Sequence, residues 1–220
     1  MKIIRVHAAF SSEIEKYFLN KLSAFLYSHI SANQLSAIAL TGALICGLSY
    51  YFAGKISLNF LHLANLGIFI HWFGDSLDGR VARLRKENRP LYGFYLDHIL
   101  DAISLTIITF GIGYSQLTLQ SSWVWVLTLF LLLMIHSFLK ASATGIFELA
   151  FERFGPTEGR LFLIGVNVTA LMLNNRIILT EPIALNVFDL FGTASAFVMA
   201  FFFLRIVLRT LLDRGQFKEN

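Results

Sequence analysis

The chain has 220 residues, of which 56% are hydrophobic and 15% are charged, and its mean hydropathy is +0.64. A soluble domain carries more charge and less apolar surface, so this composition excludes that class and predicts an integral membrane protein. The net charge of +4 suits an anionic membrane surface. The sequence has no soluble segment in which basic and aromatic residues alternate, so it does not indicate a nucleic-acid-binding protein.

The first predicted element is an amphipathic helix over about 13–29, where apolar residues recur at helical spacing among charged ones. Six apolar stretches follow, each long enough for a spanning helix of about 20 residues. The predicted fold class is therefore all-α: a polytopic membrane protein with six transmembrane helices and an N-terminal amphipathic surface helix. We expect a single domain over residues 1–220. The six stretches are 31–53, 58–82, 94–119, 123–150, 160–179 and 184–208.

The distribution of positive charge predicts the orientation, because Lys and Arg accumulate on the cytoplasmic side of membrane proteins. If the six spans alternate in direction, all of the 18 Lys and Arg residues except Lys55 and Arg176 fall on the side of both termini. We therefore expect a multi-pass protein of the cytoplasmic (inner) membrane with both termini in the cytoplasm.

Four aspartates, Asp75, Asp78, Asp97 and Asp101, stand out in this apolar sequence. Their spacings of three and four residues place each pair on one face of a helix, at the end of the second predicted span and the start of the third. Carboxylate oxygens are the ligands that Mg²⁺ and Mn²⁺ prefer, and four anions so close together repel one another without a counter-charge. The pattern therefore predicts a site for divalent cations.

These aspartates belong to a longer motif with eight fixed positions, in which nine residues separate an arginine from a glycine. The positions are Asp75, Asp78, Gly79, Ala82, Arg83, Gly93, Asp97 and Asp101. The motif resembles the signature of the CDP-alcohol phosphotransferase (CDP-alcohol phosphatidyltransferase) family. The resemblance implies a membrane enzyme that moves a substituted phosphate group from a CDP-alcohol to an acceptor alcohol, with release of CMP, in phospholipid biosynthesis.

The resemblance also implies roles for the aspartates. Asp75, Asp78 and Asp97 would be the main ligands of two divalent ions, Mg²⁺ or Mn²⁺. Asp101 would contact metal and act as the general base toward the acceptor hydroxyl. The expected partners are the CDP-alcohol, a lipid or polar alcohol substrate and membrane lipids. A homodimer is expected from the resemblance alone.

Residues around the aspartates are expected to bind the CDP part of the substrate. Gly79, Ala82 and Gly93 have almost no side chain, which lets a flat base and a pyrophosphate approach the helix backbones. Arg83 is a permanent cation that suits phosphate oxygens.

Asn33 is a further candidate for CDP binding. It lies in a segment that resembles the family's Pro-Asn-x-Leu-Thr, although Ala32 replaces the proline and Ser36 replaces the threonine. Two interpretations stay open: Asn33 contacts the nucleotide, or it caps the first predicted span.

Five polar residues are candidates for the acceptor pocket: His98, His136, Lys140, Glu158 and Arg160. His98 after the third aspartate and the pair Thr157-Glu158 resemble the aminoalcohol branch, in which Glu158 would hold a cationic head group. Simpler interpretations also stand. His98 would support its neighbouring aspartate, and His136 and Lys140 would form hydrogen bonds between helices. Glu158 would be a favourable acid at a helix N-terminus.

Two alternative functions remain open. A CDP-diacylglycerol-dependent lipid synthase with an anionic acceptor needs basic residues in the pocket, and the candidates beyond Arg83 are Lys140, Arg153 and Arg160. A divalent-cation transporter would also carry acidic residues in its spans. Such a transporter should place them near the bilayer midplane and often has internal repeats, and the sequence indicates neither feature.

Overall fold

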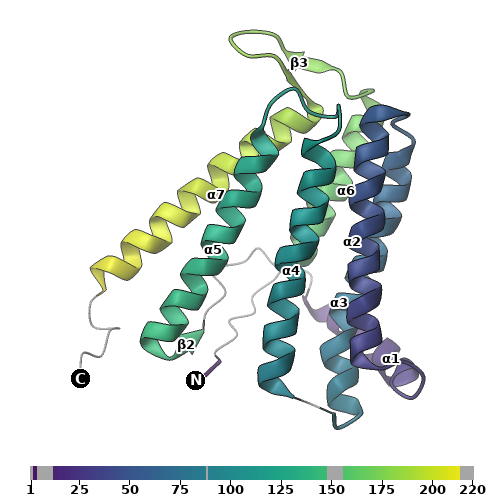
Figure 1. The fold of residues 1–220 in the computed structure, drawn as a ribbon, viewed down its shortest axis with the longest axis vertical. Helices are drawn as coiled ribbons and strands as arrows, with labels where there is room; N and C mark the ends of the chain where they lie inside the picture. The colour runs from purple at the N-terminus through teal and green to yellow at the C-terminus, as the bar shows by residue number, and fades with distance from the viewer. Residues whose placement is uncertain (1, 4–11, 88, 148–155, 214–220) are drawn as a thin grey trace.

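The computed structural model describes residues 2–3, 12–87, 89–147 and 156–213. This part of the chain is built mainly from helices that run alternately up and down, as Figure 1 shows. Apolar stretches bounded by turn residues favour helices of this length, and the helices follow one another in the predicted order. The helices are α1 (Ser12–Leu26), α2 (Ala32–Lys55), α3 (Phe60–Leu84), α4 (Pro90–Gly113), α5 (Ser122–Thr144), α6 (Pro156–Met172) and α7 (Val187–Leu212).

Four short strands complete the described chain. β1 (Lys2–Ile3) pairs in parallel with β2 (Ile146–Phe147), and β3 (Ile177–Leu179) pairs antiparallel with β4 (Leu185–Asn186). Part of the stretch predicted to span at 160–179 is therefore strand β3, and α6 ends at Met172.

Some helix boundaries differ from the predicted ones. α4 begins at Pro90 rather than at residue 94, because proline suits the first helical position, where no amide hydrogen bond is needed. α5 was predicted to continue to residue 150, which is wrong. It ends at Thr144, where Gly145 adopts the left-handed conformation with φ 74° and its amide closes on the carbonyl of Ala141.

In the described part of the chain, four helices are long and apolar enough to cross a membrane: α2, α4, α5 and α7. The chain is therefore a multi-pass membrane protein by the length and composition of its helices. α3 falls outside this group because its histidine, asparagine and aspartate residues lower its hydropathy. α6 falls outside it because its 17 residues are too few. Six spans, and a surface position for α1, therefore stay predictions.

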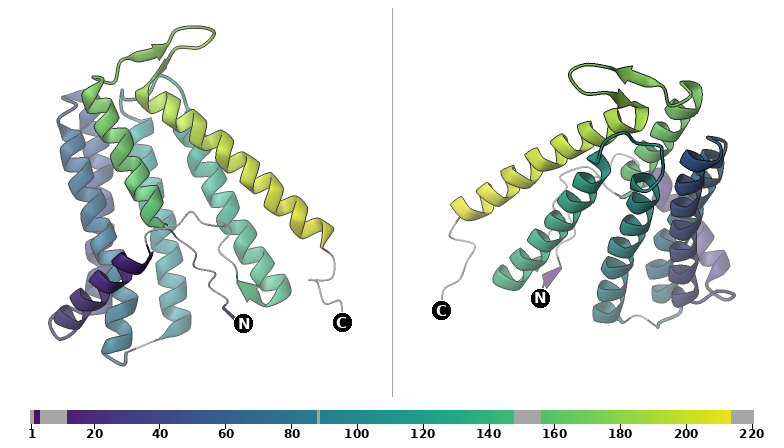
Figure 2. Two further views of the ribbon diagram at one scale, coloured as in Figure 1. Left: turned by 180° about the vertical axis from the view of Figure 1, so that it is seen from behind. Right: turned by 45° about the horizontal axis from the view of Figure 1, so that its top comes forward.

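The helices form two packed groups that meet near β3 and diverge toward the end of the bundle that holds α1 (Figures 1 and 2). α2 packs against α3 and α4, and α1 packs against α3. α5 packs against α7, and α6 contacts both α3 and α7. The starts of α2, α4 and α6 and the ends of α3, α5 and α7 lie at the α1 end.

Small residues allow α2, α3 and α4 to approach closely. A Cβ added at Gly67 of α3 would lie 2.6 Å from the amide nitrogen of Cys46, and one added at Gly47 of α2 would lie 2.7 Å from the carbonyl oxygen of Ile107. A Cβ at Gly111 of α4 would clash with the carbonyl oxygen of Gly47. The added Cβ atoms would lie closer to their neighbours than van der Waals contact allows, so the helices can pack this closely only because these residues are glycine. The three closely packed helices form one rigid support for the residues at their ends.

At the opposite end from α1, a buried carboxylate connects α7 to the loop between α4 and α5. Asp189 is 0% exposed and accepts hydrogen bonds from the backbone amides of Leu119 at 2.9 Å, Gln120 at 2.9 Å and Asn186 at 3.3 Å. A buried carboxylate bonded in this way is stable without a cationic partner. Asp189 is therefore a structural residue that closes this end of the bundle.

Candidate active site

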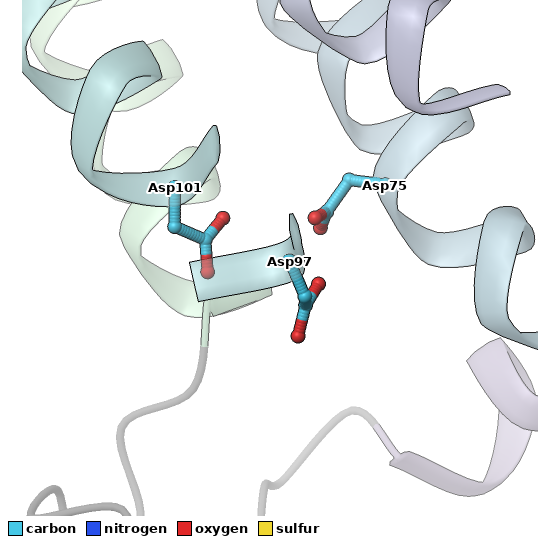
Figure 3. Close-up of side chains that lie close together, drawn as sticks. All are labelled: Asp75, Asp97 and Asp101. Carbon is cyan, nitrogen blue, oxygen red and sulfur yellow. The ribbon is translucent and has the colours of Figure 1, made fainter. Parts of the chain in front are cut away.

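Three of the four motif aspartates converge from two helices. Asp75 projects from α3, and Asp97 and Asp101 project from successive turns of α4 toward it, as Figure 3 shows. Each contributes one carboxylate oxygen to a group in which these oxygens lie within 4.8 Å of one another. All three residues are half-buried. The helical spacing read from the sequence therefore brings Asp75 and the pair Asp97 and Asp101 to one place, and Asp78 lies outside this three-residue group.

Asp78 is held by other contacts. Its Oδ2 accepts a hydrogen bond of 2.7 Å from the Ser36 hydroxyl on α2, and its Oδ1 accepts one of 2.6 Å from the backbone amide of Gly79. Ser36 is the residue at which the chain departs from the family's threonine, and it was not predicted as part of the site. Serine and threonine share the hydroxyl that makes this bond, so the substitution keeps the chemistry.

Arg160 brings a positive charge to the aspartate group from a third helix. Its Nη2 donates to Oδ2 of Asp75 at 2.5 Å, and the side chains are 12% and 20% exposed, respectively. A charge-assisted hydrogen bond at such low exposure is stronger than a surface ion pair. Arg160 was predicted for the acceptor pocket, and the structure places it directly beside a predicted metal ligand.

The three carboxylates fit a divalent cation. Oxygen ligands about 2.0–2.6 Å from such an ion lie roughly 3–5 Å from one another, and the oxygens here lie within 4.8 Å. Three like charges at this separation repel, and the Arg160 guanidinium supplies one positive charge to the group. The donors are all oxygens, which suits hard cations such as Mg²⁺ and Mn²⁺.

The residues predicted to bind CDP lie beside this group with little around them. Among the described residues, an added Cβ at Gly93 would meet nothing within 4 Å, and one at Gly79 would meet only the flexible end of Arg83, at 3.6 Å. Ala82 is half-buried, and Arg83 is exposed. The motif glycines therefore border open space, which is what a bound nucleotide needs.

Asn33 does not cap α2. Ser31 is the N-cap: its hydroxyl accepts from the backbone amide of Gln34, and the Gln34 side chain accepts from the backbone amide of Ser31 in return. Asn33 is exposed in the first turn, so the cap interpretation is wrong, and nucleotide contact stays a prediction.

The histidines of the predicted acceptor pocket make local contacts. His98 Nδ1 lies 2.7 Å from the carbonyl oxygen of Phe94, and the ring packs against Phe94 and Phe138. His136 Nε2 lies 3.5 Å from the hydroxyl of Thr210 on α7, which agrees with the simpler interpretation as a contact between helices. Both residues are therefore occupied by packing and hydrogen bonding around α5.

The other pocket candidates are placed as follows. Lys140 lies one turn after His136 on α5. Glu158 lies in the first turn of α6, where an acidic residue interacts favourably with the helix dipole. Arg153 lies outside the described residues. Arg160 contacts the aspartate group through its ion pair with Asp75, and His98 Nδ1 lies 3.8 Å from Oδ2 of Asp97.

The family comparison agrees with the motif. The family model described as CDP-alcohol phosphatidyltransferase matches residues 29–199, which include all four aspartates and Arg160. The chain belongs to this family. No curated protein sequence matches the chain.

Membership in the CDP-alcohol phosphatidyltransferase family fixes the reaction class. The protein is a transferase that moves a substituted phosphate group from a CDP-alcohol to an acceptor alcohol in phospholipid synthesis. The family uses divalent cations, and the aspartate group provides a place where one can bind. The alternative of a cation transporter is not supported.

Proposed function

We propose that the aspartate group and Arg160 form the centre at which the CDP-alcohol is cleaved and its substituted phosphate transferred. Asp75, Asp78 and Asp97 act as the main metal ligands and Asp101 as the base. The observation that carries this proposal is the convergence of Asp75, Asp97 and Asp101 from two helices to within 4.8 Å beside open space at Gly93. Two divalent ions held there, Mg²⁺ or Mn²⁺, would supply charge stabilisation of the pyrophosphate and the leaving CMP.

The residues of the chain perform the remaining steps. The open surface at Gly79, Ala82 and Gly93 receives the cytidine and pyrophosphate, with Asn33 and Arg83 at its edge. Asp101 takes the proton from the acceptor hydroxyl as the hydroxyl oxygen attacks the phosphorus that carries the alcohol. The bond from that phosphorus to the CMP oxygen breaks, and CMP leaves with the electron pair.

The substrate that we propose first is a CDP-aminoalcohol with a lipid alcohol as acceptor. The sequence pairs Asp97-His98 and Thr157-Glu158 support it, because a carboxylate at Glu158 would favour a cationic head group. The contacts of these residues limit that support, since His98 bonds to its own helix and Thr157 donates to Glu15.

A second candidate is transfer from CDP-diacylglycerol to an acceptor that carries an anionic group. The observation that favours it is Arg160, whose guanidinium reaches the aspartate group with only 12% of the side chain exposed. A planar guanidinium with several donors suits a phosphate or a carboxylate, and Lys140 and Arg153 are the other basic residues that the sequence proposes for this pocket.

A competition assay separates the two substrates. Purified protein is given either a CDP-aminoalcohol with a lipid alcohol, or CDP-diacylglycerol with inositol phosphate, glycerol phosphate or serine, and CMP release is measured. The first proposal expects turnover with the CDP-aminoalcohol. Turnover confined to CDP-diacylglycerol would replace it with the second. CMP release that persists after thorough removal of metal would contradict the proposed metal centre in either case.

The remaining parts of the proposal concern the setting of the site. We infer six spans and a surface position for α1 within a single domain, with both termini and the aspartates on the cytoplasmic side of the inner membrane. The positive charges concentrated at that end support this orientation. A homodimer is proposed from family membership, and its test is the oligomeric state in detergent.

A further inference from the structure

Glu15 in the first turn of α1 connects α1 to two other helices through one carboxylate oxygen. Its Oε1 accepts a hydrogen bond of 2.9 Å from the indole nitrogen of Trp72 on α3 and one of 2.9 Å from the hydroxyl of Thr157 on α6. All three side chains are half-buried. A carboxylate that accepts from two neutral donors in a partly buried place forms charge-assisted bonds, which are stronger than neutral ones.

Both donors lie one helical turn from the residues of the ion pair at the active site. Trp72 precedes Asp75 by three residues on α3, and Thr157 precedes Arg160 by three residues on α6. Residues three apart share a helix face. The Glu15 contacts and the contact between Arg160 and Asp75 at 2.5 Å therefore close a ring across α3 and α6, one turn apart.

This ring matters because, in the described part of the chain, it connects the start of α6, which carries Arg160, to α1 and α3. α6 contacts α3 and α7, but α7 diverges from α3 toward the α1 end of the bundle (Figure 2, left). The first turn of α6 also lacks intrahelical partners for its amides. A side-chain link from α1 therefore has a large influence on where Arg160 lies.

We propose that Glu15 is a positioning residue: by holding Thr157 of α6 and Trp72 of α3 at a fixed separation, it sets the place of Arg160 beside Asp75. The consequence is that α1, which lies outside the motif, is required for the geometry of the active site. The kinetic part of this inference rests on the proposed function. The structural part does not.

Three substitutions test the link. Glu15→Ala removes the acceptor, and Thr157→Val removes one donor while keeping the shape of the side chain. Glu15→Gln removes the charge but keeps a carbonyl oxygen that can accept both hydrogen bonds. Lys21→Ala, at an exposed position of the same helix, is the matched control.

Hydrogen–deuterium exchange over residues 156–172 in purified full-length protein gives a readout that is independent of activity. We expect exchange in the first two turns of α6 to quicken roughly fivefold or more in Glu15→Ala and Thr157→Val, as local opening becomes easier. Lys21→Ala should match the wild type, and Glu15→Gln, which keeps a neutral acceptor for both bonds, should stay closer to the wild type than to Glu15→Ala. Unchanged exchange in Glu15→Ala would overturn the proposal whatever the protein catalyses.

A double-mutant cycle measured by CMP release tests the route through Arg160. A displacement of about 1 Å at a reacting group costs up to roughly 10²-fold in rate, so we expect Glu15→Ala to lower kcat/KM about tenfold and Glu15→Gln to restore it. In an Arg160→Gln background, Glu15→Ala should cost less than about twofold more, because residues that act through one contact are not additive.

The outcomes of this cycle are distinguishable. A full tenfold loss in both backgrounds would show that Glu15 acts independently of Arg160, and no loss in the wild-type background would show that the link does not serve the reaction. Either result overturns the proposal. If the wild type releases no CMP from any CDP-alcohol, the proposed function fails, and hydrogen exchange alone then decides whether Glu15 holds α6.

Discussion

Glycines of α2, α3 and α4 serve opposite purposes in the packed half of the bundle and at the aspartate group. In the packed half, an added Cβ at Gly42 or Gly111 would clash with the backbone of a neighbouring helix, whereas at Gly93 it would meet nothing within 4 Å. The same residue type therefore allows close helix packing in one region and leaves space for a substrate in the other. Substitutions in the packed region should affect folding, and substitutions near the aspartates should affect chemistry.

The largest effect on chemistry is expected from Asp97→Asn. Asparagine is close in size to aspartate but carries no negative charge, so the three-carboxylate group loses a ligand while packing is preserved. We expect CMP release to fall about 10³-fold, at the upper end of the range that loss of electrostatic stabilisation causes. Mn²⁺ binding, followed by electron paramagnetic resonance, should weaken in parallel. Normal Mn²⁺ binding and turnover would remove Asp97 from the metal centre.

Asp101→Asn should separate binding from the chemical step. The loss of a general base lowers rates by roughly 10²–10⁴-fold, whereas the affinity for the CDP-alcohol should change less than it does in Asp97→Asn. Steady-state kinetics with a substrate-binding assay measures both quantities. If turnover stays near normal, Asp101 is not the base, and Glu158 is the next carboxylate to test.

In the packed half, Gly111→Ala should destabilise the fold. Alanine favours a helix interior over glycine by about 0.5–1 kcal/mol, but overpacking costs typically about 1–3 kcal/mol. The clash involves the rigid backbone at Gly47, so the overpacking term should dominate. The midpoint of thermal unfolding in detergent should fall, with unchanged activity per folded molecule. Gly113→Ala, on the same helix with open space around it, is the control and should not lower the midpoint.

The two regions also differ in how well the sequence predicts them. Apolar stretches located the helices, and the spacings within 75–78 and 97–101 predicted that carboxylates would share faces, because both signals come from residues close in the chain. Contacts between distant segments carry no such signal. The bonds from Ser36 to Asp78, from Arg160 to Asp75 and from Thr157 to Glu15 join residues 42, 85 and 142 positions apart, and only the packing of the helices brings them together.

Gly93→Leu tests whether the open space beside the aspartates is used. The Cβ of a leucine there would meet no described protein atom within 4 Å, and the rest of the side chain would occupy the volume proposed for the nucleotide. We expect the KM for the CDP-alcohol to rise roughly 10–100-fold, since small displacements of a bound substrate are costly. The thermal midpoint should stay unchanged. Gly113→Leu is the matched control, and equal KM values in the two variants would place the nucleotide elsewhere.

The smallest effect is expected at Ser36, which supports Asp78 from α2. Ser36→Ala removes the 2.7 Å hydrogen bond to Oδ2, while Asp78 keeps its bond from the Gly79 amide. Loss of a residue that orients a metal ligand typically lowers metal affinity or activity by about 10–100-fold, and we expect the low end, because one support remains. Ser36→Thr should restore activity, since it keeps the hydroxyl and matches the family's residue. If Ser36→Ala and Ser36→Thr lost Mn²⁺ affinity equally, the size of the side chain against α3 would matter, and the hydrogen bond to Asp78 would not.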